Sequence, residues 1–221
     1  MLDGPTEEFE RAARLCGYRR IAGIDEAGRG PLAGPVVAAA VVLPTRCRLS
    51  GVDDSKQLSE GERDRLYATI FEQAAGVGVG SADVGEIDRL NILEATRLAM
   101  RRAIDQLAPS PDYLLIDAVT LPGIKIFVRP IIKGDSLSLS IAAASIIAKV
   151  TRDRLMAMYH DMFPQYDFLS HKGYCTTRHL QQLARHGPCS IHRRTFMPVQ
   201  EAVIAEKKES VRQMSATLFE Q

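Results

Sequence analysis

Several features are missing from this chain of 221 residues, and each absence excludes a class of protein. No two of its four cysteines form a Cys-x-x-Cys pair, so we expect reduced thiols rather than a disulfide framework. The longest apolar runs, residues 35–44 and 141–148, are too short to span a bilayer. The N-terminal residues 1–10 are acidic and polar, which is not the pattern of a signal peptide. The sequence therefore predicts a cytoplasmic protein without a membrane partner.

Acidic residues are missing from one long stretch, although the whole chain carries a formal net charge of only +1. Residues 168–200 contain no Asp or Glu and hold four of the five histidines. The basic side chains of this stretch are Lys172, Arg178, Arg185, Arg193 and Arg194. We interpret the stretch as a surface on which a polyanion can dock.

Two acidic residues stand side by side at Asp25 and Glu26, directly before the turn Gly28-Arg29-Gly30. Residues 20–25 have the pattern of a strand. Two like charges in one site raise each other's pKa unless a cation neutralises them, and Mg²⁺ and Mn²⁺ take oxygen ligands. Because successive side chains of a strand point to opposite faces, the strand must end or bulge here for both to share a site. In this glycine-rich context we favour a metal site over two ordinary surface carboxylates.

Two further acids are candidates for the same site. Asp117 ends the apolar run 113–116, and open α/β sheets bind ligands at the carboxyl ends of their strands. A turn aspartate that caps a loop explains Asp117 equally well. Asp135 precedes an apolar segment with helical character, and Asp is a favoured helix N-cap, so capping competes with metal binding there. Asp153, inside the same predicted helix, is interpreted as structural.

The glycine turn also fits a different function, because Gly28-x-Gly30-x-x-Ala33 matches the dinucleotide-binding fingerprint. That fingerprint must open a helix, whereas prolines at 31 and 35 flank a segment that continues as a valine-rich strand. No Gly-Lys-Ser/Thr occurs, so there is no Walker lysine either. A dinucleotide-dependent oxidoreductase is therefore disfavoured.

A zinc site is the remaining alternative in the basic stretch. Histidines and cysteines recur at positions 171, 175, 179, 189 and 192. The ligand spacing is irregular and no compact cysteine pair exists, so we interpret these residues as part of a solvated basic face.

Strands alternating with helices favour an α/β fold in which part of the sheet is antiparallel. Strands are expected at residues 20–25, 36–43, 77–84, 113–116 and 124–128. Helices are expected at 7–15, 59–75, 90–107, 136–159, 176–186 and 199–219. The second helix should begin with a capping box made by Ser59 and Glu62.

The run Ile24-Asp25-Glu26-Ala27-Gly28-Arg29-Gly30-Pro31-Leu32-Ala33-Gly34-Pro35-Val36 resembles the signature of ribonuclease HII, the bacterial type 2 ribonuclease H. Further similar segments follow in order at residues 54–58, 116–117, 133–135, 140–153, 171–174 and 187–194. The resemblance covers residues 20–196. It implies a ribonuclease H-like fold, with a mixed five-stranded sheet flanked by helices. The implied catalytic domain spans residues 19–207, with a helical C-terminal part from about residue 155, and a tail follows at 208–221.

The resemblance also assigns residues to roles. It implies that an acidic quartet, Asp25, Glu26, Asp117 and Asp135, is catalytic and binds two Mg²⁺ or Mn²⁺ ions. It implies substrate contacts by Gly28, Arg29, Gly30, Lys56, Lys149, Lys172, Tyr174, Arg193 and Arg194. In this family the glycine turn senses the 2′-hydroxyl of RNA, and the tyrosine packs on the next sugar. Cys175 departs from the family pattern, which has glycine at that place, and its Cβ narrows the backbone angles allowed next to Tyr174.

The implied reaction is two-metal hydrolysis of the RNA strand of RNA–DNA hybrids. The implied enzyme also cuts 5′ of single ribonucleotides in duplex DNA and leaves 5′-phosphate and 3′-hydroxyl ends. Such an enzyme serves RNA primer removal and ribonucleotide excision repair. A monomer is expected. The sequence leaves open whether a replication clamp binds the tail, and a cleavage assay must exclude a hybrid-binding protein that has lost catalysis.

Overall fold

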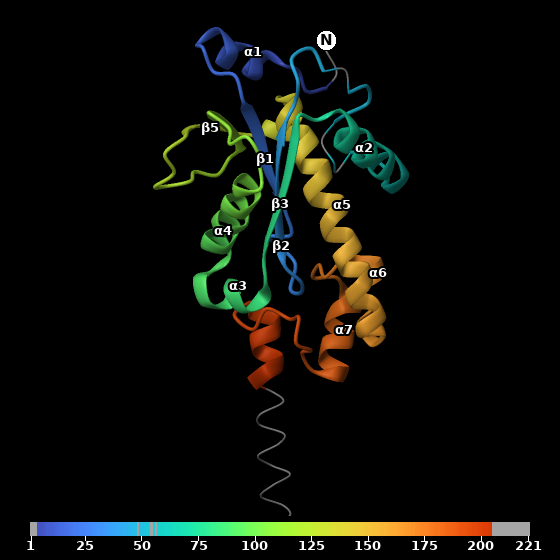
Figure 1. Cartoon of the computed structure of the whole chain (residues 1–221). Coiled ribbons are helices and arrows are strands. Elements are labelled where there is room, and N and C mark those ends of the chain that lie inside the picture. Colours follow the sequence, from blue (N-terminus) through green and yellow to red (C-terminus); the bar gives the residue numbers. More distant parts are fainter. Residues whose placement is uncertain (1–3, 48, 54, 56, 205–221) are drawn as a thin grey trace, which may run out of the picture. The chain divides into compact units, whose positions relative to one another are not determined.

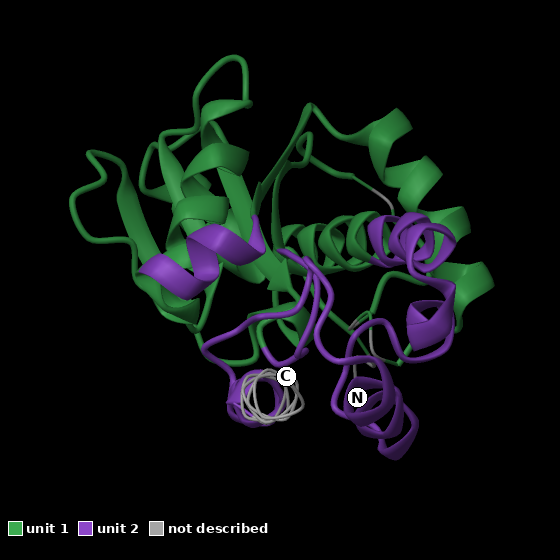
Figure 2. Ribbon diagram, turned by 90° about the horizontal axis from the view of Figure 1, so that it is seen from below, with its two compact units in different colours: residues 1–29, 36–82, 90–152 green, residues 30–35, 83–89, 153–221 purple. Residues whose placement is uncertain are grey.

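The computed structural model describes residues 4–47, 49–53, 55 and 57–204, and it divides into two compact units. Unit 1 consists of residues 1–29, 36–82 and 90–152, and unit 2 consists of residues 30–35, 83–89 and 153–221. Figure 1 labels their helices and strands, and Figure 2 gives each unit its own colour.

Unit 1 is built on a sheet of five strands in the order β3-β2-β1-β4-β5. The strands are β1 (Ile21–Ala27), β2 (Val36–Val42), β3 (Gly76–Ala82), β4 (Tyr113–Asp117) and β5 (Phe127–Ile131). The pairs β1–β2 and β2–β3 are antiparallel, whereas β1–β4 and β4–β5 are parallel. This confirms the expected mixed sheet. It also puts the two carboxyl ends of β1 and β4 at the same edge.

The helices largely follow the sequence pattern. They are α1 (Glu8–Leu15), α2 (Glu60–Gln73), α3 (Val84–Leu90), α4 (Ile92–Asp105), α5 (Leu139–Met162), α6 (Phe168–His171) and α7 (Thr177–His186). Two 3₁₀ turns, η1 (Gly134–Ser136) and η2 (Pro164–Tyr166), precede α5 and α6. The capping box predicted for Ser59 and Glu62 is confirmed at the start of α2. A last helix begins at residue 197, and its predicted part beyond 204 lies outside the described residues.

Helices α4 and α5 cover opposite faces of the sheet (Figure 1). Helix α4 packs on β2 and β3, where glycines let its backbone come close. A Cβ on Gly78 would lie 2.1 Å from the carbonyl oxygen of Ala103, and one on Gly80 2.2 Å from that of Ala99. On the other face, the apolar first half of α5 packs with α2 against β2. This confirms that the first half of α5 is buried, as its apolar sequence predicts.

The start of α5 is held by the N-terminal helix. Glu10 of α1 is buried, and its Oε1 accepts hydrogen bonds from the Ser138 hydroxyl at 2.6 Å, the Ser140 hydroxyl at 2.5 Å and the Ser140 backbone N–H at 2.9 Å. A carboxylate at this place satisfies the unpaired donors of a helix N-terminus and complements the helix dipole. Helix α1 is therefore joined to α5, although more than a hundred residues separate them.

Unit 2 contains α6, α7, the C-terminal part of α5 and the segment 30–35. Two small cores hold it together, one around Tyr166 and Phe168 and the other around Leu183 and Val199. Within the part of the chain that the structure describes, no helix has the length and hydropathy that a membrane crossing requires.

Candidate active site

Three aspartates from three elements meet at one end of the sheet in unit 1. The parallel pair Ile24–Ile116 brings the next residues of β1 and β4, Asp25 and Asp117, side by side. Asp135 joins them from η1. Each of the three offers one carboxylate oxygen, and these oxygens lie within 4.8 Å of one another. We call this group the aspartate cluster.

The electrostatics of the aspartate cluster favour a bound cation. The pKa of Asp25 is raised well above its usual value, chiefly by burial and then by the charges of Glu26 and Asp117. The Glu26 backbone N–H opposes this shift by donating to Asp25 Oδ1 at 2.7 Å. Asp117 Oδ1 accepts from the Gly134 backbone N–H at 2.8 Å, which fixes its orientation. An oxygen-only donor set with mutually repelling charges suits a hard divalent cation, so these residues fit a metal of the Mg²⁺ or Mn²⁺ type.

Glu26 is not part of the aspartate cluster. The ladder between β1 and β2 continues without a bulge through Asp25–Ala39, Glu26–Ala38 and Ala27–Val37. The strand therefore has no bulge at the acidic pair and ends one residue later, at Ala27. The Glu26 carboxylate instead forms an ion pair with Arg29, at 3.2 Å.

Asp135 is not the N-cap of the long helix, which corrects the capping alternative. The 3₁₀ turn η1 holds Asp135, and α5 begins only at Leu139. The Ser138 hydroxyl, directly before α5, accepts from the Ile141 N–H at 3.3 Å. The buried Asp135 is thus placed by η1 in the aspartate cluster.

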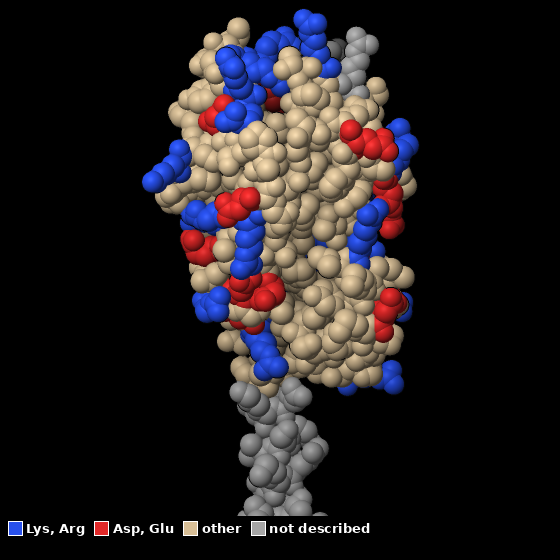
Figure 3. Space-filling view, in the orientation of Figure 1, with Lys and Arg blue, Asp and Glu red and all other residues tan. Residues whose placement is uncertain are grey.

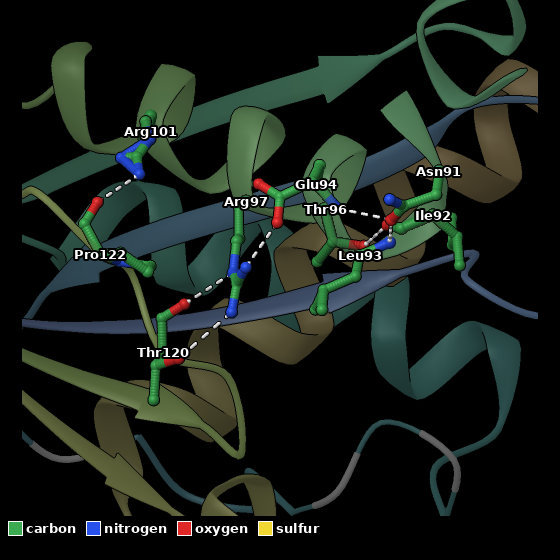
Figure 4. A network of polar contacts seen from close by, with 9 residues as sticks. All are labelled: Asn91, Ile92, Leu93, Glu94, Thr96, Arg97, Arg101, Thr120 and Pro122. Atoms are coloured by element: carbon green, nitrogen blue, oxygen red, sulfur yellow. Dashed lines mark hydrogen bonds and ion pairs between the residues drawn. The ribbon is translucent and has the colours of Figure 1, made fainter. Parts of the chain in front are cut away.

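The loop that follows Asp117 is anchored by two arginines of α4 (Figure 4). Arg97 donates to the carbonyl oxygen of Thr120 at 3.0 Å, and Arg101 donates to that of Pro122 at 2.6 Å. Figure 4 also shows the start of α4, where the Asn91 side chain accepts from two backbone N–H groups of the first turn. No pattern in the sequence pointed to these arginines, which hold the chain as it leaves the aspartate cluster.

The glycine turn begins with a position that only glycine suits. Gly28 has φ +96°, and a Cβ there would lie 2.0 Å from Nε of Arg152, a fully buried arginine of α5. Arg29, which follows, is exposed. The Arg152 side chain therefore packs directly against the glycine turn, and the sequence did not predict this contact.

In unit 2 the glycine turn continues next to Tyr174. A Cβ on Gly30 would lie 4.0 Å from Cε1 of Tyr174, so the ring and this glycine are neighbours. The tyrosine is 45% exposed. Gly173 has φ +84°, whereas Cys175 does not have positive φ, so a side chain at 175 imposes no strained backbone there. The departure at Cys175 is therefore tolerated locally.

The predicted substrate-binding cations lie in different environments. Lys149 and Lys172 are partly buried, Arg194 is exposed, and Lys56 lies outside the described residues. On the face drawn in Figure 3, Lys and Arg side chains are interspersed with Asp and Glu. That face is therefore not one continuous basic surface.

Arg193 is placed in the interior of unit 2 instead of on a basic surface. It is fully buried, its Nε donates to the carbonyl oxygen of Gly34 at 3.0 Å, and its guanidinium lies over the Phe196 ring. The backbone of the next residue, Arg194, is held by Asp88, whose Oδ2 accepts from its N–H at 3.0 Å. Of the two arginines, Arg194 has the exposure that a phosphate contact requires.

The expected solvated face of histidines is also wrong. His171, His179 and His192 are buried, and the rings of His171 and His179 stack at 4.4 Å between centroids. Burial lowers the pKa of all three, and that of His192 falls to about 3. These side chains are neutral parts of the core of unit 2.

Comparison with known proteins shows the family to which the chain belongs. A family model described as Ribonuclease HII matches residues 22–199. The chain belongs to the ribonuclease HII family. Its relatives include the Ribonuclease HII of Geotalea uraniireducens, which is 57% identical over 200 residues that cover 90% of this chain and 93% of the relative. The family implies nuclease activity of the ribonuclease H class, and the predicted family resemblance is confirmed.

Solved structures of the same class share the fold. The ribonuclease H2 from Pyrococcus horikoshii has a TM-score of 0.72 and 28% identity, covering 83% of this chain and 97% of that chain. The RNase HII in a PCNA complex from Archaeoglobus fulgidus has a TM-score of 0.67 and 28% identity, covering 79% and 92%. The expected ribonuclease H-like fold is confirmed.

Proposed function

We propose that this protein is a metal-dependent endoribonuclease that hydrolyses the RNA strand of RNA–DNA hybrids and cuts 5′ of single ribonucleotides embedded in duplex DNA. The observation that carries the proposal is the aspartate cluster, formed by the signature residue Asp25, by Asp117 and by Asp135. The products are a 5′-phosphate and a 3′-hydroxyl. Primer removal and ribonucleotide excision repair are the cellular roles that this chemistry serves.

Asp25, Asp117 and Asp135 would hold two divalent cations, Mn²⁺ or Mg²⁺. When bound, the cations supply Lewis-acid activation of water and charge stabilisation at the phosphodiester. Glu26 belongs to the proposed ligand set through its place in the signature, and its charge already acts on Asp25. In the structure its carboxylate pairs with Arg29, so its entry into the ligand set requires exchange of that ion pair.

The glycine turn and Tyr174 would distinguish ribose from deoxyribose on the two sides of the cut. Gly28 and Gly30 bring backbone groups to a 2′-hydroxyl without an intervening side chain, and a 2′-hydroxyl is both a donor and an acceptor. Tyr174, the neighbour of Gly30, would pack its ring on the sugar to the 3′ side of the cut. A deoxyribose fits closely against the ring, whereas a second 2′-hydroxyl is crowded. This pair of contacts selects a ribonucleotide followed by a deoxynucleotide.

Exposed and partly buried cations would hold the phosphates. Arg29, Lys149, Lys172 and Arg194 are the described candidates, and Lys56 is a further one outside the described residues. Such contacts give affinity without reading sequence. Arg193 would contribute indirectly, by fixing the backbone of segment 30–35. A replication clamp remains a proposed partner of the tail 208–221, also outside the described residues.

The decisive experiment is cleavage of a DNA duplex that carries one ribonucleotide, with Mn²⁺, with Mg²⁺ and with a chelator. We expect one incision 5′ of the ribonucleotide only when a divalent cation is present. An all-DNA duplex of the same sequence is the control. Binding of the duplex without cleavage under every metal condition would identify a hybrid-binding protein and overturn the proposal.

The role of Tyr174 predicts a difference between two substitutions. Tyr174→Ala should lower the cleavage rate at a single embedded ribonucleotide by about tenfold, the loss expected for one well-packed aromatic contact. Tyr174→Phe should remain close to the parent protein, because the ring and not the hydroxyl makes the contact. Rates on single-ribonucleotide duplexes and on continuous hybrids are the measurement. Equal rates for both variants and the parent on both substrates would make Tyr174 a structural residue.

A further inference from the structure

The Tyr174 ring is exposed, whereas the Tyr174 backbone N–H and carbonyl both form hydrogen bonds. The Gly173 N–H donates to Nδ1 of His171 at 3.2 Å, and the Gly173 carbonyl accepts from Leu32 at 2.8 Å. The Tyr174 N–H donates to the His171 carbonyl at 2.9 Å. The Tyr174 carbonyl accepts from the Thr176 N–H at 2.9 Å and also lies 2.9 Å from Nδ1 of His179. The backbone from which the exposed ring projects is thus fixed before a substrate arrives.

Two buried histidines form a chain of hydrogen bonds that ends on Tyr174. The Cys189 backbone N–H donates to Nδ1 of His192 at 3.0 Å, so His192 carries its proton on Nε2. That Nε2 lies 3.0 Å from Nε2 of His179. Because a carbonyl oxygen only accepts, His179 carries its proton on Nδ1, facing Tyr174, and accepts at Nε2. All three bonds can form together only when both rings are neutral and hold these tautomers.

The surrounding side chains lock the two rings in place. The His171 ring stacks on His179, and Phe168 meets His179 edge-on at 5.5 Å between centroids. Tyr166 packs against His192 at 4.9 Å. His171 itself is fixed by the Tyr166 carbonyl oxygen, 2.8 Å from its Nε2. A ring flip of either histidine would break the chain of bonds and disturb this packing.

The same side chains do not make a metal site. Nδ1 of His192 and both ring nitrogens of His179 are already committed to hydrogen bonds. Among the described residues, the aspartate cluster is the one group of three or more close ligating side chains. The zinc alternative therefore has no support in the packing of unit 2.

We propose that His179 and His192 are positioning residues for sugar selection, and that they act by holding the Tyr174 carbonyl and so the backbone from which the Tyr174 ring projects. The inference rests on the proposed function, since it requires Tyr174 to contact the sugar. Neither histidine touches the substrate. Preorganising the backbone that carries the ring reduces the entropy lost when the substrate binds.

The test uses two substitutions of His179 that differ in where they place an amide nitrogen. His179→Asn can place its nitrogen near the position of Nδ1 and keep the bond to the Tyr174 carbonyl, whereas His179→Gln places it nearer Nε2. The measurement is the ratio of kcat/KM on a single-ribonucleotide duplex to kcat/KM on a continuous hybrid. We expect His179→Gln to lower this ratio about fivefold, the equivalent of one net hydrogen bond, and His179→Asn to restore it.

A double-mutant cycle then separates positioning from simple stabilisation. In a Tyr174→Ala background, His179→Gln should cause no further fall in the ratio, because the ring on which it acts is gone. An equal fall in both backgrounds would overturn the inference and leave the proposed role of Tyr174 standing. If Tyr174→Ala by itself leaves the ratio unchanged, the proposed role of Tyr174 fails, and the inference fails with it.

A second pair of variants covers the case in which His179→Gln does not fold. His192→Gln can keep a donor near Nε2 toward His179, whereas His192→Leu cannot. Thermal melting first identifies the folded variants. We expect His192→Leu to lower the ratio and His192→Gln to preserve it, and the same ratio in both would overturn the inference.

Discussion

Asp117→Asn is expected to reduce cleavage of RNA–DNA hybrids by roughly a thousandfold or more, since the charge that holds the cation is removed. The amide oxygen can still accept from the Gly134 N–H, so the local backbone is preserved. The measurement is single-turnover cleavage at saturating Mn²⁺ or Mg²⁺. Asp105→Asn, the same chemical change at an exposed position of α4, should leave the rate unchanged. Turnover near that of the parent would remove Asp117 from the ligand set.

For the same substitution we also predict a change in melting temperature, which can be measured without an activity assay. The folded state raises the pKa of Asp25, so ionised Asp25 costs stability without metal. This cost is absent below the unfolded pKa and is complete once the pH exceeds the raised folded pKa. Asp117 contributes to that shift, so in chelator at neutral pH Asp117→Asn should melt at the parent temperature or above it. Adding Mn²⁺ should raise the Tm of the parent more than that of the variant.

Gly23→Ala is expected to cost about 3 kcal/mol or more of the free energy of unfolding, or to prevent folding. A Cβ on Gly23 of β1 would lie 2.1 Å from the carbonyl carbon of Ser140 and 2.4 Å from the nitrogen of Ile141. Both atoms belong to the α5 backbone, so the helix would have to move away from the sheet. Urea unfolding of parent and variant, followed by fluorescence or circular dichroism, measures the difference.

A second glycine-to-alanine substitution, at a position with open space, is the control for Gly23→Ala. Gly61 lies in α2, and nothing comes within 4 Å of a Cβ built there. Gly61→Ala should therefore stabilise the protein, by about 0.5–1 kcal/mol, through the helix propensity of alanine. If Gly23→Ala were as stable as the parent, β1 and α5 could not be as close as the structure has them.

Local signals in the sequence predicted much of the fold and part of the site. The capping box of Ser59 needs only residues within one turn, and it forms as expected. Asp117 was placed by its position at the end of an apolar run, and the parallel pairing of β1 and β4 brings it to Asp25. Features of this kind depend on neighbours in sequence or on a general rule for sheets.

The errors fall where long-range packing decides. The ion pair between Glu26 and Arg29 depends on how the turn after β1 folds, so the sequence did not predict it. A basic stretch without acids suggested an exposed surface, yet Arg193 and His192 are buried because segment 30–35 packs against them. The contact between Arg152 and Gly28 could not be predicted from the sequence, because more than a hundred residues separate them.

The hydrogen bonds of Glu10 show that the region shared with the family is shorter than the region whose contacts build the fold. The family match begins at residue 22, and the proposed catalytic domain begins at 19, so both leave α1 outside. Yet Glu10 satisfies the donors of Ser138 and Ser140 just beyond the turn that carries Asp135. A chain trimmed to the homologous region would lose the carboxylate that accepts from the Ser140 N–H at the start of α5 and would keep only the Ser138 hydroxyl there. The residues that satisfy the buried polar groups of the fold therefore extend beyond its recognisable motif.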